Sequence, residues 1–164
     1  VVLSVGLIPE MQMVKGVSVN PKTNGAFVNE HYETEKEWIF SCGNILHVHD
    51  LVDNVALEGK QVGLFASLYA QKKLNNGNLI KVSHSADFSY VLPYTLFEGE
   101  EEVEVKFRLK KKVVKSWIVC LSQGNIIAKK YVLAGVPGEM MTFKFSKKGV
   151  KEEIVFEVRE NGKI

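Results

Sequence analysis

The sequence predicts an α+β protein, in which a strand, a glycine turn and a helix are followed by a small antiparallel β-sandwich. The first part rests on an apolar run that stops at Gly43, after which apolar residues recur near helical spacing from about Asp50 to Leu74. The second part rests on short segments after residue 80 that alternate apolar and charged residues, with turn signals at intervals of roughly 8 to 12 residues.

The chain opens with "VVLSVGLIPE", which is typical of a buried strand that runs into a glycine and a proline. A buried parallel strand needs a neighbour on each side, and the residues that follow offer little to supply one. We therefore expect the 164 residues to be part of a longer protein.

Two turn signals, Asn20-Pro21 and Asn24-Gly25, predict a short loop or hairpin, followed by a short strand at 26–30. Residues 38–42 then predict a buried strand that ends at Gly43. Asp50 or Asp53 is well placed for the N-terminus of the helix that comes next.

The sequence "NNGN", at 75–78, tolerates left-handed backbone, closes the helix and marks the best domain boundary. We therefore expect one domain over 1–79 and a β-sandwich-like domain over 80–164. In the second domain, the sequence predicts strands at 103–109, on both sides of the turn at 123–125, at 140–146 and at 152–160. The last two are separated by 147–149.

Composition excludes several classes of protein. Hydrophobic residues make up 46% and charged residues 24%, as in ordinary globular proteins. A net charge of +2, from 21 basic and 19 acidic residues, does not indicate a nucleic-acid or membrane surface. No apolar stretch approaches the roughly 18 to 20 residues of a membrane span. Cys42 and Cys120 form no CxxC pair, so we expect a reducing compartment and a cytoplasmic protein.

The pair His47 and His49, followed by Asp50, raises the question of a metal site. A zinc site needs three or four ligands, and the only other histidines in the sequence are His31 and His84. The spacing therefore predicts no metal site, and favours polar residues in a loop before a helix.

The other chemical candidates have simpler structural interpretations. Cys42 ends an apolar run and is expected to be buried and inert rather than nucleophilic, and Cys120 is expected in the core. Trp117 and Tyr131 are expected in the sandwich core or at its rim. The charge clusters at 100–102 and 110–112 are typical of solvated strand ends, with partner docking as the alternative.

The pattern of strand, glycine and helix itself favours a cofactor rim. A helix N-terminus presents unpaired N–H groups and a partial positive charge, to which phosphate or ring oxygens bind. Gly43 has no Cβ and would allow a ligand to approach the backbone closely.

The segment "IFSCGNILHVHDLVDNVALEGKQVG" resembles the last flavin-binding segment of the FAD-dependent pyridine nucleotide-disulfide oxidoreductases, in which Ala-x-Gly-Asp ends a strand before a helix with Glu-Gly or Ala-Gly. "VVLSVGLIPE" is similar to the exit from their NAD(P)H domain, and "NPKTNGAFVNEHYETEKEWIFSCGN" to the link between the two. The resemblance covers about residues 1–74 and is strongest to bacterial oxidoreductases associated with an anaerobic glycerol 3-phosphate dehydrogenase, which carry a β-rich tail. For 80–164 there is only an overall likeness.

The resemblance implies that residues 1–79 are an incomplete α/β dinucleotide-binding segment. Gly43 and Asn44 match the Gly-Asp that meets the ribityl and phosphate part of FAD, with Asn in place of the charged Asp. A second set matches the helix start that faces the flavin pyrimidine ring: Leu51, Val52 and Asp53. Gly6 matches a neighbour of NAD(P).

The function implied is hydride transfer from NAD(P)H through FAD to an acceptor, with His47 and His49 lining the pocket or facing a substrate and available for proton transfer. The chain contains neither GxGxxG nor CxxC, so we expect it to be inactive and to bind neither FAD nor NAD(P) alone. The alternative is a non-catalytic, β-rich interaction module that docks a dehydrogenase or electron-transfer subunit. A third interpretation is a structural tail that supports a flavoprotein homodimer.

Overall fold

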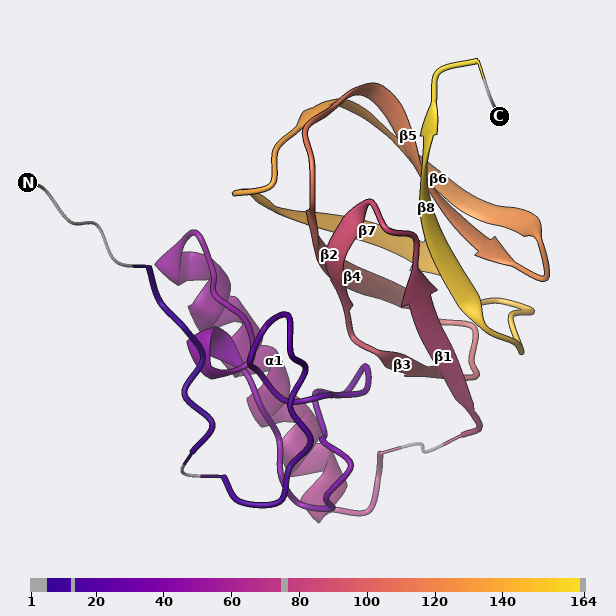
Figure 1. Cartoon of the computed structure of the whole chain (residues 1–164). Coiled ribbons are helices and arrows are strands. Elements are labelled where there is room, and N and C mark those ends of the chain that lie inside the picture. The colour runs from indigo at the N-terminus through magenta and orange to yellow at the C-terminus, as the bar shows by residue number, and fades with distance from the viewer. Residues whose placement is uncertain (1–5, 13, 75–76, 163–164) are drawn as a thin grey trace, which may run out of the picture. The chain divides into compact units, whose positions relative to one another are not determined.

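One long helix in the first part of the chain and two β-sheets in the second part make up the regular structure (Figure 1). The computed structural model describes residues 6–12, 14–74 and 77–162. The chain divides into two compact units, Val1–Leu74 and Asn75–Ile164, referred to below as unit 1 and unit 2.

Unit 1 is mostly loop around a single helix, α1, which spans Val52–Ala70. The predicted hairpin is present, because Val19 pairs with Ala26 and the Asn20 amide donates to the Gly25 carbonyl at 2.9 Å. The strand predicted at 26–30 is reduced to isolated bridges. The opening strand lies largely outside the described residues, and Gly6 to Glu10 have no regular structure.

The strand predicted at 38–42 is wrong. Trp38 has a φ of 72° and is 69% exposed, and Phe40 makes only an isolated bridge with Glu33. A buried strand needs partners on both sides, and the described part of unit 1 contains none. The prediction relied on the apolar composition of this segment, which does not show whether strand partners are present.

Helix α1 ends four residues earlier than the periodicity predicts. Lys72 adopts a φ of 56°, the Lys73 amide donates to the Leu68 carbonyl and the Lys72 amide donates to the Tyr69 carbonyl, both at 2.9 Å. These paired bonds form a Schellman motif, in which a left-handed residue stops the helix. Lys72 thus ends the helix before the predicted "NNGN" signal.

Unit 2 is a β-rich fold of two sheets. One sheet has the order β3-β1-β8-β5-β6 and the other the order β2-β4-β7. Its strands are β1 (Leu79–His84), β2 (Phe88–Leu92), β3 (Thr95–Phe97), β4 (Glu102–Leu109), β5 (Val113–Ser122), β6 (Asn125–Gly135), β7 (Met140–Ser146) and β8 (Ile154–Glu160).

Alternation explains why the two sheets share a core. In β4, Val103, Val105, Phe107 and Leu109 are all buried, as the alternation predicts. They join buried side chains from both sheets in one hydrophobic cluster, which includes Phe156. Most strand pairs are antiparallel, but β1 and β8 are parallel, which the predicted antiparallel sheet did not anticipate.

Candidate functional site

The most unusual group in unit 1 is a buried cluster of two histidines and a glutamate: His47, His49 and Glu58. Their side chains are 0% exposed. His47 Nε2 lies 3.2 Å from Glu58 Oε2, and His49 Nε2 lies 3.1 Å from Glu58 Oε1. Both imidazoles therefore converge on one carboxylate, which we call the His-His-Glu cluster.

The loop before α1 positions the histidines. Gly43 has a φ of 67° and begins a 3-10 turn, Gly43–Ile45, whose carbonyl at Gly43 accepts the amides of Leu46 and His47. His47 and His49 are two positions apart, so in an extended segment their side chains leave the backbone on the same side. Both consequently face the same helix residue.

Helix α1 supplies the carboxylate. Val55, Glu58 and Val62 are spaced by three and four residues, so they lie on one side of the helix, and Glu58 and Val62 are its buried residues. Glu58 Oε1 also accepts the Gly43 amide at 2.6 Å. Sequence reasoning missed Glu58, although a carboxylate within an apolar helical stripe is the signal that would have found it.

The predicted FAD-contacting residues of the loop lie around this cluster. Gly43 is buried, and a Cβ there would lie 3.2 Å from Val55 Cγ1. A glycine is therefore favoured here because the backbone is left-handed and the Val55 side chain is close. The space beside Gly43 is not open to a ligand. Asn44 is exposed, and its Oδ1 accepts the His49 amide at 3.0 Å, so its amide nitrogen is the group that can donate to a ligand.

The predicted residues of the helix start are exposed. Leu51 is the N-cap residue and Val52 begins α1, with exposed fractions of 64% and 79%, and Asp53 is also exposed. Leucine has no side-chain oxygen with which to cap the first amides. The N-terminus of α1 therefore presents backbone donors that no N-cap side chain satisfies.

Other predicted residues lie apart from the cluster. Gly6 is exposed, and apart from its chain neighbours no described atom lies within 4 Å of the position that a Cβ there would take. Cys42 is half-buried, whereas Cys120 lies in the core, where burial raises the pKa of its thiol to about 12. Cys120 is therefore in the core, as predicted, whereas Cys42 is less buried than predicted.

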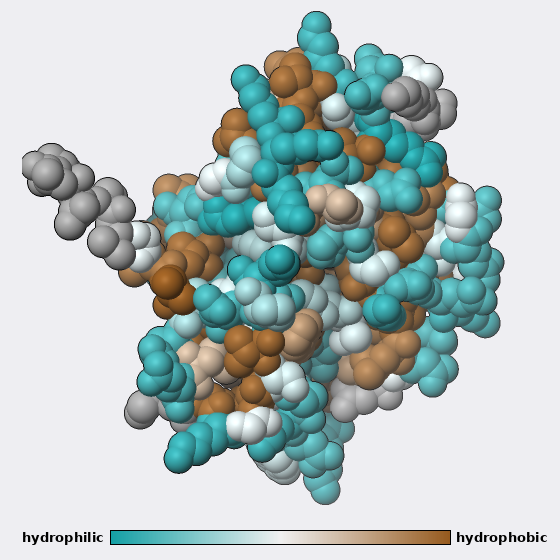
Figure 2. All heavy atoms as spheres, viewed as in Figure 1, coloured by the Kyte–Doolittle hydropathy of each residue, from teal (hydrophilic) through white to brown (hydrophobic). Residues whose placement is uncertain are grey.

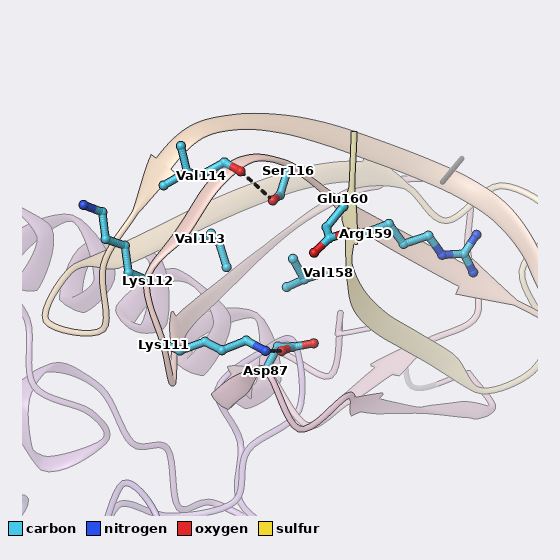
Figure 3. Close-up of a pocket in the computed structure, with 9 residues that line it drawn as sticks. All are labelled: Asp87, Lys111, Lys112, Val113, Val114, Ser116, Val158, Arg159 and Glu160. Atoms are coloured by element: carbon cyan, nitrogen blue, oxygen red, sulfur yellow. Dashed lines mark hydrogen bonds and ion pairs between the residues drawn. The ribbon is translucent and has the colours of Figure 1, made fainter. Parts of the chain in front are cut away.

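A cavity of about 520 Å³ lies in unit 2 (Figure 3). It is lined by Asp87, Lys111, Lys112, Val113, Val114, Ser116, Val158, Arg159 and Glu160. The charges are partly paired, because Lys111 Nζ lies 2.8 Å from Asp87 Oδ1 and Arg159 Nη2 lies 3.1 Å from Glu157 Oε2. Figure 3 shows Lys111 and Asp87 meeting, with the Lys112 side chain directed away from them. The lining includes neither histidine nor cysteine, and its hydroxyl group, Ser116 Oγ, donates a hydrogen bond to the Val114 carbonyl at 2.9 Å.

Trp117 and Tyr131 form a surface pair rather than core. Their ring centroids are 5.1 Å apart in an edge-to-face arrangement, Tyr131 is 40% exposed, and Lys129 Nζ lies 4.9 Å from the Trp117 ring. The charge clusters expected at strand ends flank β4 on both sides, at 100–102 and 110–112.

The site in unit 1 therefore combines an uncapped, exposed helix N-terminus with a buried cluster that fixes the loop before it. Among the described residues, no helix is both long enough and apolar enough to cross a bilayer. The function has to be inferred from these residues, since no protein-family profile, no curated protein and no solved structure matches this chain.

Proposed function

We propose that this chain is the C-terminal part of a flavoprotein oxidoreductase that transfers hydride between NAD(P)H and an acceptor through FAD, and that residues 42–53 form one wall of the FAD pocket. The observation that carries the proposal is the exposed N-terminus of α1, which directly follows a glycine turn in a segment with the flavoprotein-like pattern. Unit 1 is then the incomplete dinucleotide-binding segment.

The helix N-terminus has the electrostatics that a flavin needs. The first amides of an α-helix carry a partial positive charge and lack intrahelical acceptors. Leu51 and Val52 are exposed beside them and would pack on an aromatic ring system. The amide nitrogen of Asn44 adds one donor on the preceding turn. The chain's own contribution is therefore to bind and orient the flavin, which supplies the redox chemistry when bound.

The apolar surface of unit 1 supports an incomplete domain. Val52, Ile8 and Trp38 are 79%, 72% and 69% exposed, and Figure 2 shows brown, apolar side chains on the visible surface around α1. Large exposed apolar areas mark surfaces that another part covers. We assign this surface to the flavin and nicotinamide domains that would carry the GxGxxG loops.

The proposal assigns unit 2 a supporting role. Its two sheets share one core, which supports a small β-sandwich. In this account it is the β-rich tail of the flavoprotein and stabilises the assembly.

The test is the flavin content of the native protein, captured from its cell with an antibody to this chain. We expect about one FAD per polypeptide. A Val52→Asp variant of the native gene should lose the flavin, because a carboxylate in the first helical turn stabilises the helix but repels the anionic cofactor. Val114→Asp, at an exposed position of unit 2, is the matched control and should retain it.

Native protein without flavin would contradict the proposal, and so would equal flavin content in the two variants. The choice of Val52 makes the comparison informative, because loss of FAD cannot be attributed to a weakened helix. Far-ultraviolet circular dichroism of both variants checks that the fold is kept.

A second candidate function, an interaction module that docks a dehydrogenase or electron-transfer subunit, is favoured by β6. This edge strand of the five-stranded sheet is largely exposed and carries Ile126, Ile127 and Leu133 on its surface. An exposed edge can pair with a strand of a partner. Capture of such a subunit from native extract by the 164-residue chain, and its loss with Leu133→Lys, would support this function. Equal capture by both chains would count against it.

A further inference from the structure

The His-His-Glu cluster has the donor set of a transition-metal site. Two imidazole nitrogens and a carboxylate are ligands that Zn²⁺ takes in proteins. One ligand atom from each of the three residues lies within 4.8 Å of the others. We propose that His47, His49 and Glu58 bind one zinc-type divalent ion, which fastens the loop at 43–49 to α1.

The distances fit this role. Ligand atoms with bonds of 2.0–2.1 Å to a tetrahedral ion lie about 3.3 Å from one another. His47 Nε2 and His49 Nε2 lie 3.2 Å and 3.1 Å from oxygens of Glu58. The imidazoles approach different oxygens of the carboxylate. Glu58 could bind an ion through one oxygen or through both, which lie closer together than separate tetrahedral ligands do, so three side chains would supply three or four donor atoms.

The charge balance also favours an ion. The buried Glu58 carboxylate lies within hydrogen-bond distance of both imidazoles, and burying a carboxylate is costly unless hydrogen bonds or positive charge compensate it. A divalent ion supplies both the charge and the bonds. Because the side chains are 0% exposed, we assign the ion a structural rather than a catalytic role.

The surroundings of the cluster hold the ligands in place. Glu58 Oε1 accepts the Gly43 amide at 2.6 Å, and Asn44 Oδ1 accepts the His49 amide at 3.0 Å. Such outer contacts orient metal ligands in known sites. His49 Nδ1 is buried and has no hydrogen-bond partner among the described residues, so the orientation of this ring is set through Nε2.

This site is separate from the proposed flavin contact. The flavin wall uses exposed backbone donors at the start of α1, whereas the ion would lie among buried side chains one to two turns further along the helix. Either assignment can hold without the other.

The test uses the 164-residue chain, produced without a polyhistidine tag, freed of metal with a chelator and then incubated with Zn²⁺. After excess ion is removed, metal analysis should find about one Zn²⁺ per chain. His47→Ala, His49→Ala and Glu58→Gln should each retain less than about a tenth of that. His84→Ala removes an exposed histidine of unit 2 and is the matched control, which should retain the wild-type amount.

A second readout separates binding at the cluster from adsorption elsewhere. Zn²⁺ should raise the unfolding temperature of the wild type and of His84→Ala, but not of Glu58→Gln, which keeps the shape of the side chain and removes its charge. Co²⁺ in place of Zn²⁺ should give the visible absorption of a four-coordinate site in the wild type. Wild-type chain that retains no Zn²⁺ would overturn the proposal, and so would equal retention by the wild type and the three cluster variants.

Discussion

Glu58 is the residue on which the local structure of unit 1 depends most. It lies on the buried side of α1, where an apolar residue would be expected, and its carboxylate contacts the Gly43 amide and both histidines. Without the carboxylate, one backbone donor and two imidazoles would be left buried without their acceptor. Single residues with several buried polar partners of this kind make large contributions to stability.

Replacing Glu58 by alanine should lower the free energy of unfolding of unit 1 by about 3 kcal/mol, because it leaves buried polar partners unpaired. Trp38 packs edge-to-face on Tyr69 at 4.9 Å and reports on this unit. A Trp117→Phe background leaves Trp38 as the single tryptophan, so urea unfolding followed by its fluorescence measures the effect. Glu37→Ala, at an exposed position, is the control. Equal midpoints for the two variants would contradict the role of Glu58.

The ion pair between Asp87 and Lys111 gives unit 2 a specific pH dependence. The hydrogen bond from Lys111 is the main cause that lowers the pKa of Asp87 below its ordinary value of 3.8. A carboxyl with a lowered pKa stabilises the folded state at pH values above its ordinary pKa, and that stability is lost as the pH falls through the folded pKa.

At pH 7, Asp87→Asn should therefore unfold at a slightly lower urea concentration than the wild type. At a pH low enough to protonate Asp87 in both the folded and the unfolded wild type, the two proteins should unfold at the same urea concentration. Lys111 is exposed, so the difference at pH 7 should be small and should shrink in high salt. Trp117 fluorescence in a Trp38→Phe background reports on unit 2. A difference that persists well below pH 3.8 would show that the ion pair is not its cause.

At the scale of elements, strands with one solvent-exposed face could be predicted from alternation. The strand predicted at 38–42 is absent. The sequence of β4 alternates, and its buried residues are those predicted. The parallel partner of β1 is β8, about 70 residues away in the sequence, and a periodicity within one segment carries no information about such pairing. The segment at 38–42 has the composition of a strand, but a strand also needs hydrogen-bonding partners.

Close approach of two loops makes a glycine necessary at residue 25. A Cβ on Gly25 would lie 1.7 Å from the Leu46 carbonyl oxygen, which is backbone and cannot move aside cheaply. Gly25→Ala should therefore destabilise unit 1 by about 3 kcal/mol. At Gly63, in the interior of α1, a Cβ would meet no described atom within 4 Å beyond its chain neighbours and the helix backbone, so Gly63→Ala should stabilise the unit by about 0.5–1 kcal/mol. Urea unfolding with Trp38 as the reporter measures both, and a shift of the same sign for both would contradict the account.

At the scale of the whole molecule, unit 2 has a hydrophobic core of its own, and both units leave large apolar side chains exposed, up to 79% at Val52 in unit 1 and 67% at Leu133 in unit 2. Gly43, Asn44 and the start of α1 lie near one another because they are close in sequence, and their contact with a flavin stays a prediction. The His-His-Glu cluster was not predicted, since it depends on which side of α1 faces the loop. The relation of Gly6 to a nicotinamide site remains a prediction.

The intact mass of the polypeptide that carries this sequence in its native cell tests the central claim most directly. Capture with an antibody to the chain and mass spectrometry under denaturing conditions give the value. If this chain is the C-terminal part of a flavoprotein, the mass should exceed 18.4 kDa by at least one further domain, which corresponds to roughly 100–150 residues. A native polypeptide of 18.4 kDa would contradict that account and would favour the interaction module.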